Sequence, residues 1–224
     1  MIYGIWTFCA ALIAFIISTV TGKFLIPYLR KLHFGQTILE EGPKWHKGKQ
    51  GTPTMGGIMF IVAIVIVTIA STVVYAVTGN EFVTSFYADI PKECVLIFCG
   101  LGLAVANGVI GFIDDYIKVV MKRNLGLTPA QKMLGQIVIT AVFAFYMVNH
   151  SGLGTDVIIP FSGGKEWHLG ILYIPILFVV VLGTVNGANF TDGLDGLAAS
   201  VTTLIAVFLT VIAVGTNAGI HPVI

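Results

Sequence analysis

The sequence predicts an all-α polytopic membrane protein with about six transmembrane helices. Of its 224 residues, 56% are hydrophobic and only 10% are charged, whereas about 25% of residues are charged in a typical soluble domain. The charged residues also leave six uncharged runs of 20 residues or more, and a helix of about 20 residues spans the ~30 Å of bilayer hydrocarbon. A buried helix of a soluble protein could explain one such run, but it does not explain six.

The predicted spans follow one another along a single domain of residues 1–224. They are 1–22, 50–80, 94–113, 133–155, 167–191 and 196–224. The first run has no basic segment before it and no small-residue cleavage site, so we expect it to stay as a span and not to be removed as a signal peptide. Between the fourth and fifth spans, strand-like pieces at 157–160 and 165–169 surround a glycine pair, which predicts a small external β-hairpin.

The distribution of lysine and arginine predicts the orientation of the chain. Ten of the 12 basic residues lie in two loops, 23–49 and 116–132, and the other two are Lys92 and Lys165. Cytoplasmic loops are the ones enriched in basic residues, so these two loops are predicted to be cytoplasmic and the N-terminus to be outside. The partner expected from this composition is a lipid bilayer and not a nucleic acid.

Two adjacent carboxylates, Asp114 and Asp115, lie at the cytoplasmic end of the third predicted span. A carboxylate costs about 2.5–3.5 kcal/mol at the centre of a membrane helix, so those that persist near spans usually have a function. Two like charges this close repel each other unless a cation joins them, and Mg²⁺ binds carboxylate oxygens together with substrate phosphates. The alternative is a solvated helix end that Lys118 neutralises, and the pair by itself leaves both readings open.

The segment 186–196 combines glycines with polar side chains between two spans. Asp192 and Asp195 are three residues apart, which would place them on one face of a helical segment. Its glycines allow a ligand to approach the backbone closely, and Asn189 and Thr191 add neutral donors and acceptors. A plain turn between helices is the alternative, but a turn does not require so many polar groups, so the pattern favours a functional site.

Basic residues near these segments are candidates for phosphate binding. Segment 49–57 brings Lys49, the hydroxyl of Thr54 and a glycine pair to the start of the second span, and helix N-termini attract anions. Four further basic residues follow the aspartate pair: Lys118, Lys122, Arg123 and Lys132. They could form a wall that binds a diphosphate, or they could simply face anionic lipid on the cytoplasmic side; the two readings are compatible.

Four segments, in this order and with suitable spacing, resemble the signatures of the phospho-N-acetylmuramoyl-pentapeptide-transferase family. This family is a bacterial branch of the polyprenyl-phosphate hexosamine-1-phosphate transferase superfamily. The segments are GTPTMGG at 51–57, GFIDDYIK at 111–118, LGLT at 125–128 and NFTDGLDGLA at 189–198. An Asp-Asp pair is typical of the whole superfamily, whereas the first and last segments together are more specific to this branch. The likeness covers essentially the whole chain.

The resemblance implies a Mg²⁺-dependent enzyme of the bacterial inner membrane with its active site on the cytoplasmic face. Such an enzyme transfers phospho-MurNAc-pentapeptide from UDP-MurNAc-pentapeptide to undecaprenyl phosphate, which gives lipid I and UMP in peptidoglycan biosynthesis. By position, the resemblance implies Asp114, Asp115 and Asp195 as catalytic residues, with Asp115 and Asp195 also as metal ligands. The implied substrate-binding residues are Lys49, Thr54, Lys118, Lys122, Lys132, Asn189, Asp192 and Gly193.

Family members are homodimers with ten transmembrane helices, and the six predicted spans correspond to the N-terminal part of that fold. Two later cytoplasmic motifs of the family, a metal-binding aspartate beside glycines and a His-rich stretch, do not occur in residues 1–224. We therefore expect a membrane domain that lacks the C-terminal part of the family fold and its main metal aspartate.

Three other functions remain open from the sequence. The nearest is a related transferase that uses another UDP-N-acetylhexosamine, and the second is an inactive fragment that needs a partner. A transporter is the third, because intramembrane carboxylates also mark ion pathways. The acids here cluster at helix ends and the centres of the spans are uncharged, which favours chemistry at the membrane surface over transport.

Overall fold

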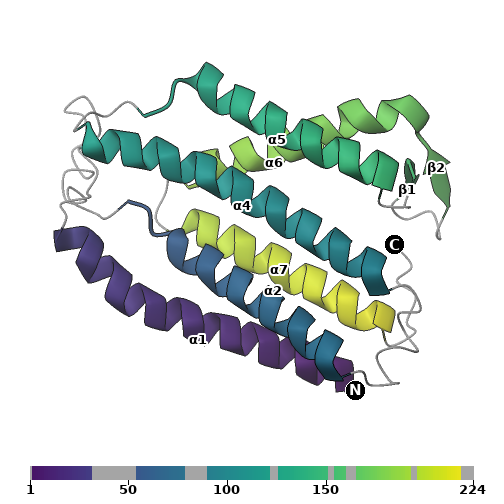
Figure 1. Ribbon diagram of the computed structural model, residues 1–224, viewed down its shortest axis with the longest axis horizontal. Coiled ribbons are helices and arrows are strands. Elements are labelled where there is room, and N and C mark those ends of the chain that lie inside the picture. Colours follow the sequence, from purple (N-terminus) through teal and green to yellow (C-terminus); the bar gives the residue numbers. More distant parts are fainter. Residues whose placement is uncertain are drawn as a thin grey trace. The chain divides into compact units, whose positions relative to one another are not determined.

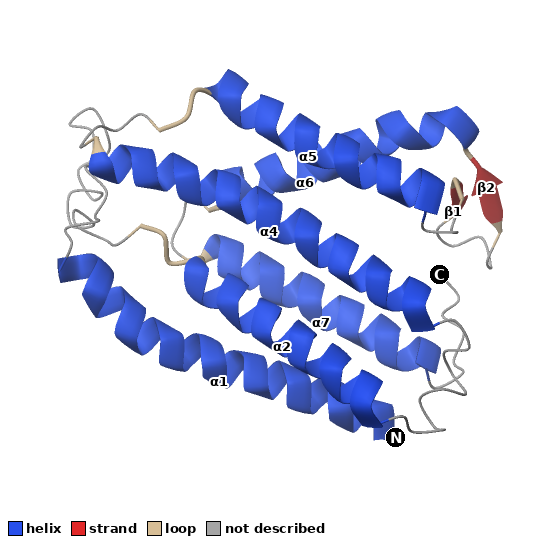
Figure 2. Ribbon diagram, viewed as in Figure 1, coloured by secondary structure: helices blue, strands red, loops and turns tan. Residues whose placement is uncertain are grey.

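The computed structural model describes residues 2–31, 54–78, 90–121, 126–150, 154–159, 165–192 and 196–217. Helices make up most of these ranges (Figure 2). Contacts within the chain divide it into two units. One is Cys9–Gln136, and the other joins Met1–Phe8 to Ile137–Ile224.

The Cys9–Gln136 unit is built from neighbouring helices (Figure 1). They are α1 (Ile2–Lys31), α2 (Ile58–Thr78), α4 (Ile90–Val120) and the first residues of α5 (Pro129–His150). Their apolar composition suits them to hydrocarbon, where a helix satisfies its own backbone hydrogen bonds. Val95–Val120 of α4 is long and apolar enough to cross a membrane, and so is Phe8–Lys31 of α1.

Glycines set how closely these helices pack. A Cβ on Gly22 of α1 would lie 2.9 Å from the Met59 sulfur of α2, and a Cβ on Gly108 of α4 would lie 2.8 Å from the Ile61 Cδ1 of α2. Membrane helices associate through close packing at small residues, because lipid tails are as apolar as the side chains they replace. Gly22 and Gly108 therefore allow α2 to lie tightly between its two neighbours.

Basic side chains gather at one end of this unit. The last turn of α1 holds Arg30 and Lys31, and the last turn of α4 holds Lys118. Lys132 lies in the first turn of α5, close to the end of α4, where its ammonium group contacts Asp114. The up-and-down order of the helices therefore brings these described basic side chains to the same end, as the orientation predicted from lysine and arginine requires.

The second unit contains the rest of α5 and the remaining elements. These are β1 (Asp156–Ile158), β2 (Glu166–His168), the 3-10 helix η2 (Gly170–Leu172), α6 (Tyr173–Thr191) and α7 (Leu197–Asn217). The two strands pair antiparallel with Val157 opposite Trp167, which confirms the predicted β-hairpin. Asp156 and His168 face each other across the strands, and His168 Nδ1 lies in hydrogen-bonding contact with Asp156 Oδ1.

Large apolar side chains are exposed over both units. Phe15 is 73% exposed, Phe145 65% and Val179 72%. Such exposure is rare on soluble proteins but is expected where lipid surrounds the helices. Two more helices are long and apolar enough to span, Pro129–His150 and Gly170–Thr191, while α2 and α7 contain the shorter apolar stretches Ile58–Val74 and Leu197–Val211. The chain is a multi-pass membrane protein.

Six long helices in the described ranges confirm the six predicted ones, but several extend past the uncharged runs. α1 continues through Lys23 to Lys31, and α4 continues through Asp114 to Val120. The reason is that a charged residue marks where the hydrocarbon ends, and it does not interrupt the backbone hydrogen bonds of a helix. The basic residues at the end of α1 and the Asp114–Asp115 pair of α4 therefore lie on helical turns and not in loops.

Candidate active site

Asp114 and Asp115 lie in the last two turns of α4 but have different environments. Successive residues of an α-helix point about 100° apart, at 3.6 residues per turn, so neighbours cannot face the same way. Asp114 is only 5% exposed, whereas the side chain of Asp115 is 32% exposed. One carboxylate is therefore enclosed by protein, and the other stays accessible at the end of the unit.

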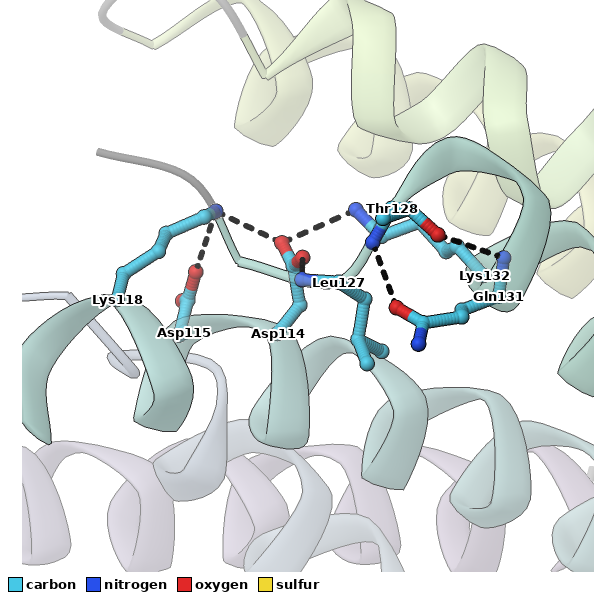
Figure 3. Close-up of polar contacts among 7 residues, drawn as sticks. All are labelled: Asp114, Asp115, Lys118, Leu127, Thr128, Gln131 and Lys132. Carbon is cyan, nitrogen blue, oxygen red and sulfur yellow. Dashed lines mark hydrogen bonds and ion pairs between the residues drawn. The ribbon is translucent and has the colours of Figure 1, made fainter. Parts of the chain in front are cut away.

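Three donors hold the Asp114 carboxylate (Figure 3). Lys118 Nζ lies 2.7 Å and Lys132 Nζ 3.0 Å from Oδ2, and the backbone N–H of Leu127 donates to Oδ1 at 2.9 Å. Lys118 Nζ also lies 3.1 Å from Oδ1 of Asp115. The two carboxylates and the two ammonium groups form a neutral cluster, as a group of charges this close to hydrocarbon requires.

Gly126 allows the segment before α5 to reach this carboxylate. A Cβ on Gly126 would lie 2.6 Å from the backbone carbonyl oxygen of Asp114 and even closer to Oδ1. No larger residue fits without movement of one of the two backbones. Glycine at this position therefore lets the next residue, Leu127, donate its N–H to Asp114.

A capping box begins α5 and directs Lys132 to the cluster. The Gln131 N–H donates to Thr128 Oγ1 at 3.2 Å, and the Thr128 N–H donates to Gln131 Oε1 at 2.9 Å. This reciprocal pair satisfies backbone donors that a helix start otherwise leaves open, and Pro129 suits the first helical position because it needs no donor there. Lys132 follows directly, so the geometry of the cap determines where its ammonium group lies.

We expect Thr128→Ala to lower the stability of the protein by about 1 kcal/mol, the usual cost of losing an N-cap hydroxyl. The measurement is thermal unfolding in detergent micelles. Thr203→Ala is the matched control, because Thr203 lies inside α7 and its hydroxyl donates to the Ala199 carbonyl of the same helix. Equal effects of the two changes would contradict a capping role for Thr128.

Comparison with known proteins shows the family to which the chain belongs. Residues 95–223, more than half of it, match the model of glycosyl transferase family 4. The chain belongs to this family. Residues 49–61 also match the phospho-N-acetylmuramoyl-pentapeptide-transferase signature 1, so two independent stretches of the chain agree with the resemblance expected from its motifs.

Curated relatives of the chain support the same branch. A phospho-N-acetylmuramoyl-pentapeptide-transferase of Clostridium kluyveri is 44% identical over 203 residues, which are 91% of this chain and 58% of the relative. The enzyme of that name from Desulforamulus reducens is 45% identical over 211 residues, 93% of this chain and 58% of the relative. The Bacillus subtilis protein of that name is 44% identical over 186 residues, which are 83% of this chain and 52% of the relative. The chain thus spans a little over half the length of these relatives.

Of the two adjacent carboxylates, Asp115 is the better fit for a metal ion. Mg²⁺ is commonly bound by one or two carboxylates plus substrate phosphates, and Asp115 is partly exposed whereas Asp114 is enclosed by three donors. In the described ranges, no group of three His, Cys, Asp or Glu side chains could hold a metal ion. A metal here would therefore use Asp115, substrate oxygens and ligands from other parts of the protein.

The other predicted site residues fall into three groups. Thr54 is half-buried just before α2, within the same unit as the aspartate pair. Asn189 and Asp192 are exposed at the end of α6, in the second unit, and α6 ends at Thr191. The remaining four lie outside the described residues: Lys49, Lys122, Gly193 and Asp195. The expected same-face arrangement of Asp192 and Asp195 stays a prediction.

Sequence reasoning missed how the segment before α5 contributes to the site. It noted LGLT at 125–128 only as a family signature, and it assigned no role to Gly126, Leu127 or Gln131. A signal for one of these roles was present, because Thr128-Pro129-Ala130-Gln131 has the pattern of a capping box with proline at its first helical position. The backbone N–H of Leu127 has no sequence signal, since every residue except proline has one.

Proposed function

We propose that this chain provides part of the active site of a phospho-N-acetylmuramoyl-pentapeptide-transferase. The enzyme would move phospho-MurNAc-pentapeptide from UDP-MurNAc-pentapeptide to undecaprenyl phosphate and form lipid I. The observation that carries the proposal is the buried Asp114 cluster with Asp115 beside it, at the basic end of a membrane-helix unit. A lipid phosphate is confined to that level of the membrane, so its reaction must take place there.

The proposed reaction is a phosphoryl transfer, in which positioning and charge neutralisation supply most of the catalysis. An oxygen of the acceptor phosphate attacks the phosphorus atom that bears the sugar. The new P–O bond links the two phosphates of lipid I, and the bond from that phosphorus to the UMP oxygen breaks, so UMP leaves with the electron pair. Atoms and charges balance without any oxidant or reductant.

Asp114 is proposed to act by orientation. Its two oxygens already accept from Lys118, Lys132 and the Leu127 N–H, and all three donors stabilise the charged carboxylate. Such a group holds two ammonium groups in place beside the position of the acceptor phosphate. Deprotonation of the acceptor by Asp114 is the alternative, and it would use the one remaining acceptor site of the carboxylate, on Oδ1.

The neutral cluster also indicates that a phosphate-binding site needs further positive charge. Two lysines balance two aspartates, so no net charge remains for a diphosphate and an acceptor phosphate. We propose that Asp115 and Asp195 bind Mg²⁺, which neutralises charge that develops on the phosphates. Lys49, Lys122 and Thr54 would bind nucleotide or phosphate, and Asn189, Asp192 and Gly193 would orient the uridine.

The proposal places the protein in the bacterial inner membrane with Asp114 at the cytoplasmic face. The concentration of ten of the 12 basic residues in sequence segments 23–49 and 116–132 supports that orientation. The family resemblance adds a homodimer as the expected assembly, with the lipid bilayer, UDP-MurNAc-pentapeptide and undecaprenyl phosphate as partners.

A chimera tests the proposed function. In it, this chain replaces the matching part of the Bacillus subtilis relative, and release of UMP from UDP-MurNAc-pentapeptide is measured in membranes with undecaprenyl phosphate. We expect UMP release with this donor and little with UDP-GlcNAc. A chimera that folds and inserts but prefers UDP-GlcNAc would favour the related transferase, and one without activity toward either donor would contradict the proposal. The chain assayed alone shows whether it needs a partner.

We expect Asp115→Asn in this chimera to raise the Mg²⁺ concentration for half-maximal UMP release by about 10-fold or more, because changes near metal ligands commonly cost 10–100-fold in affinity. The measurement is a Mg²⁺ titration of initial rates. Thermal unfolding is the control, and it should change little because the Asp115 side chain is partly exposed. An unchanged Mg²⁺ requirement would show that Asp115 is not a metal ligand.

A further inference from the structure

A groove with a volume of about 480 Å³ lies between α1 and the beginning of α2. Its walls are mainly apolar and include Phe15 and Ile26 of α1 with Met59 and Phe60 of α2. One basic residue, Lys23, is also part of the lining, and no acidic residue is. The groove belongs wholly to the Cys9–Gln136 unit.

The groove has the depth of one leaflet of a bilayer. Lys23 is the first charged residue of α1 and follows the uncharged run 1–22, so it marks the end of the ~30 Å of hydrocarbon on this side. From Lys23 back to Phe15 the rise is about 12 Å, which lies within the ~15 Å half-thickness of the hydrocarbon. The charged end of the groove is therefore at the headgroup level, and its apolar end is in the acyl region.

The end of the groove at Lys23 is suited to an anionic headgroup. Among the described residues, Lys23 is in no ion pair, and the lining offers it no carboxylate. α2 begins at Ile58, directly before two lining residues, and the start of a helix adds partial positive charge. Pro27 also lines this end, and because proline has no N–H it cannot donate to the Lys23 carbonyl four residues earlier.

We propose that this groove binds one anionic glycerophospholipid. An acyl chain lies along Phe15, Ile26, Met59 and Phe60, and the headgroup phosphate pairs with the Lys23 ammonium group. A headgroup hydroxyl donates to the Lys23 carbonyl that Pro27 leaves without its helical donor. A polyprenyl phosphate fits less well, because its chain is much longer than the single-leaflet depth of the groove. This lipid site is independent of the proposed transferase function.

The test is lipid titration of the purified, delipidated chain, followed by native mass spectrometry. The probes are phosphatidylglycerol and phosphatidylcholine. We expect one phosphatidylglycerol to bind more tightly than phosphatidylcholine, and Lys23→Gln to weaken it about fivefold, since one basic residue near the membrane surface contributes about 1 kcal/mol. Ser18→Trp, which places a ring in the groove, should weaken both lipids, and Lys23→Arg should keep the affinity.

Arg30→Gln is the matched control, because Arg30 is an exposed basic residue of the same helix that does not line the groove. It should leave phosphatidylglycerol binding unchanged. The proposal is overturned if Arg30→Gln and Lys23→Gln have equal effects, if both lipids bind alike, or if undecaprenyl phosphate displaces phosphatidylglycerol in a Lys23-dependent way. Thermal unfolding of each variant separates loss of lipid from loss of fold.

Discussion

Replacement of Asp114 by asparagine is expected to lower UMP release by about 100-fold or more, as misplacement of groups by about 1 Å commonly does. The amide that replaces the carboxylate carries no charge and brings its own N–H donors, so it cannot neutralise Lys118 and Lys132. The two ammonium groups then repel each other and separate. We also expect a loss of stability of about 1.5–3 kcal/mol, the usual contribution of hydrogen bonds to a charged group, because the two lysines are partly exposed.

UMP release by the chimera and its thermal unfolding measure these two effects. Asp156→Asn is the matched control, because Asp156 pairs with His168 on the exposed hairpin, and it should alter neither quantity appreciably. Near-normal UMP release by the Asp114→Asn variant would contradict the proposed role of Asp114. A large loss of stability with normal turnover in the folded fraction would restrict Asp114 to a structural role.

The second large effect is expected from Gly126→Ala. The added methyl group would overlap the Asp114 carbonyl and carboxylate, so the segment before α5 must move away and the Leu127 N–H must leave Asp114. Overpacking of this kind costs about 1–3 kcal/mol. Turnover should fall together with stability, since the same movement displaces Lys132, four residues after Thr128 at the start of α5.

Gly183→Ala is the comparison for this change. A Cβ on Gly183 in α6 would meet nothing within 4 Å, and alanine favours a helix over glycine by about 1 kcal/mol. Gly183→Ala should therefore leave the melting temperature in detergent unchanged or raise it slightly, whereas Gly126→Ala should lower it. Equal changes in melting temperature for the two variants would show that the close approach of Gly126 to Asp114 does not limit stability.

The helices were predictable because the bilayer imposes a length on them. Uncharged runs of 20 residues or more seldom form anything except a membrane-spanning helix. All six runs contain most of a long helix. The ends were less predictable. α1 continues past Lys23 and α5 begins at Pro129, before its uncharged run, because helix ends depend on caps and backbone donors while the runs depend on charge.

The site was predictable where it depends on residue type and not where it depends on folding of the backbone. Adjacent aspartates at a span end indicated Asp114 and Asp115, and Lys118 also neutralises them through ion pairs, as the alternative interpretation predicted. The sequence could not show that Asp114 is buried while Asp115 is not. That difference depends on which side of α4 meets the 126–128 segment.

The ion pairs of Asp114 bear on how the protein enters the membrane during synthesis. Lys118 is four residues from Asp114 and Lys132 is eighteen, so all partners of this carboxylate emerge from the ribosome within a short stretch of chain. A helix that carries unpaired charges is costly to insert into the membrane, whereas charges that neutralise each other in an ion pair lower this cost. We therefore expect α4 and α5 to insert as a hairpin, with Asp114 neutralised before any later helix is made.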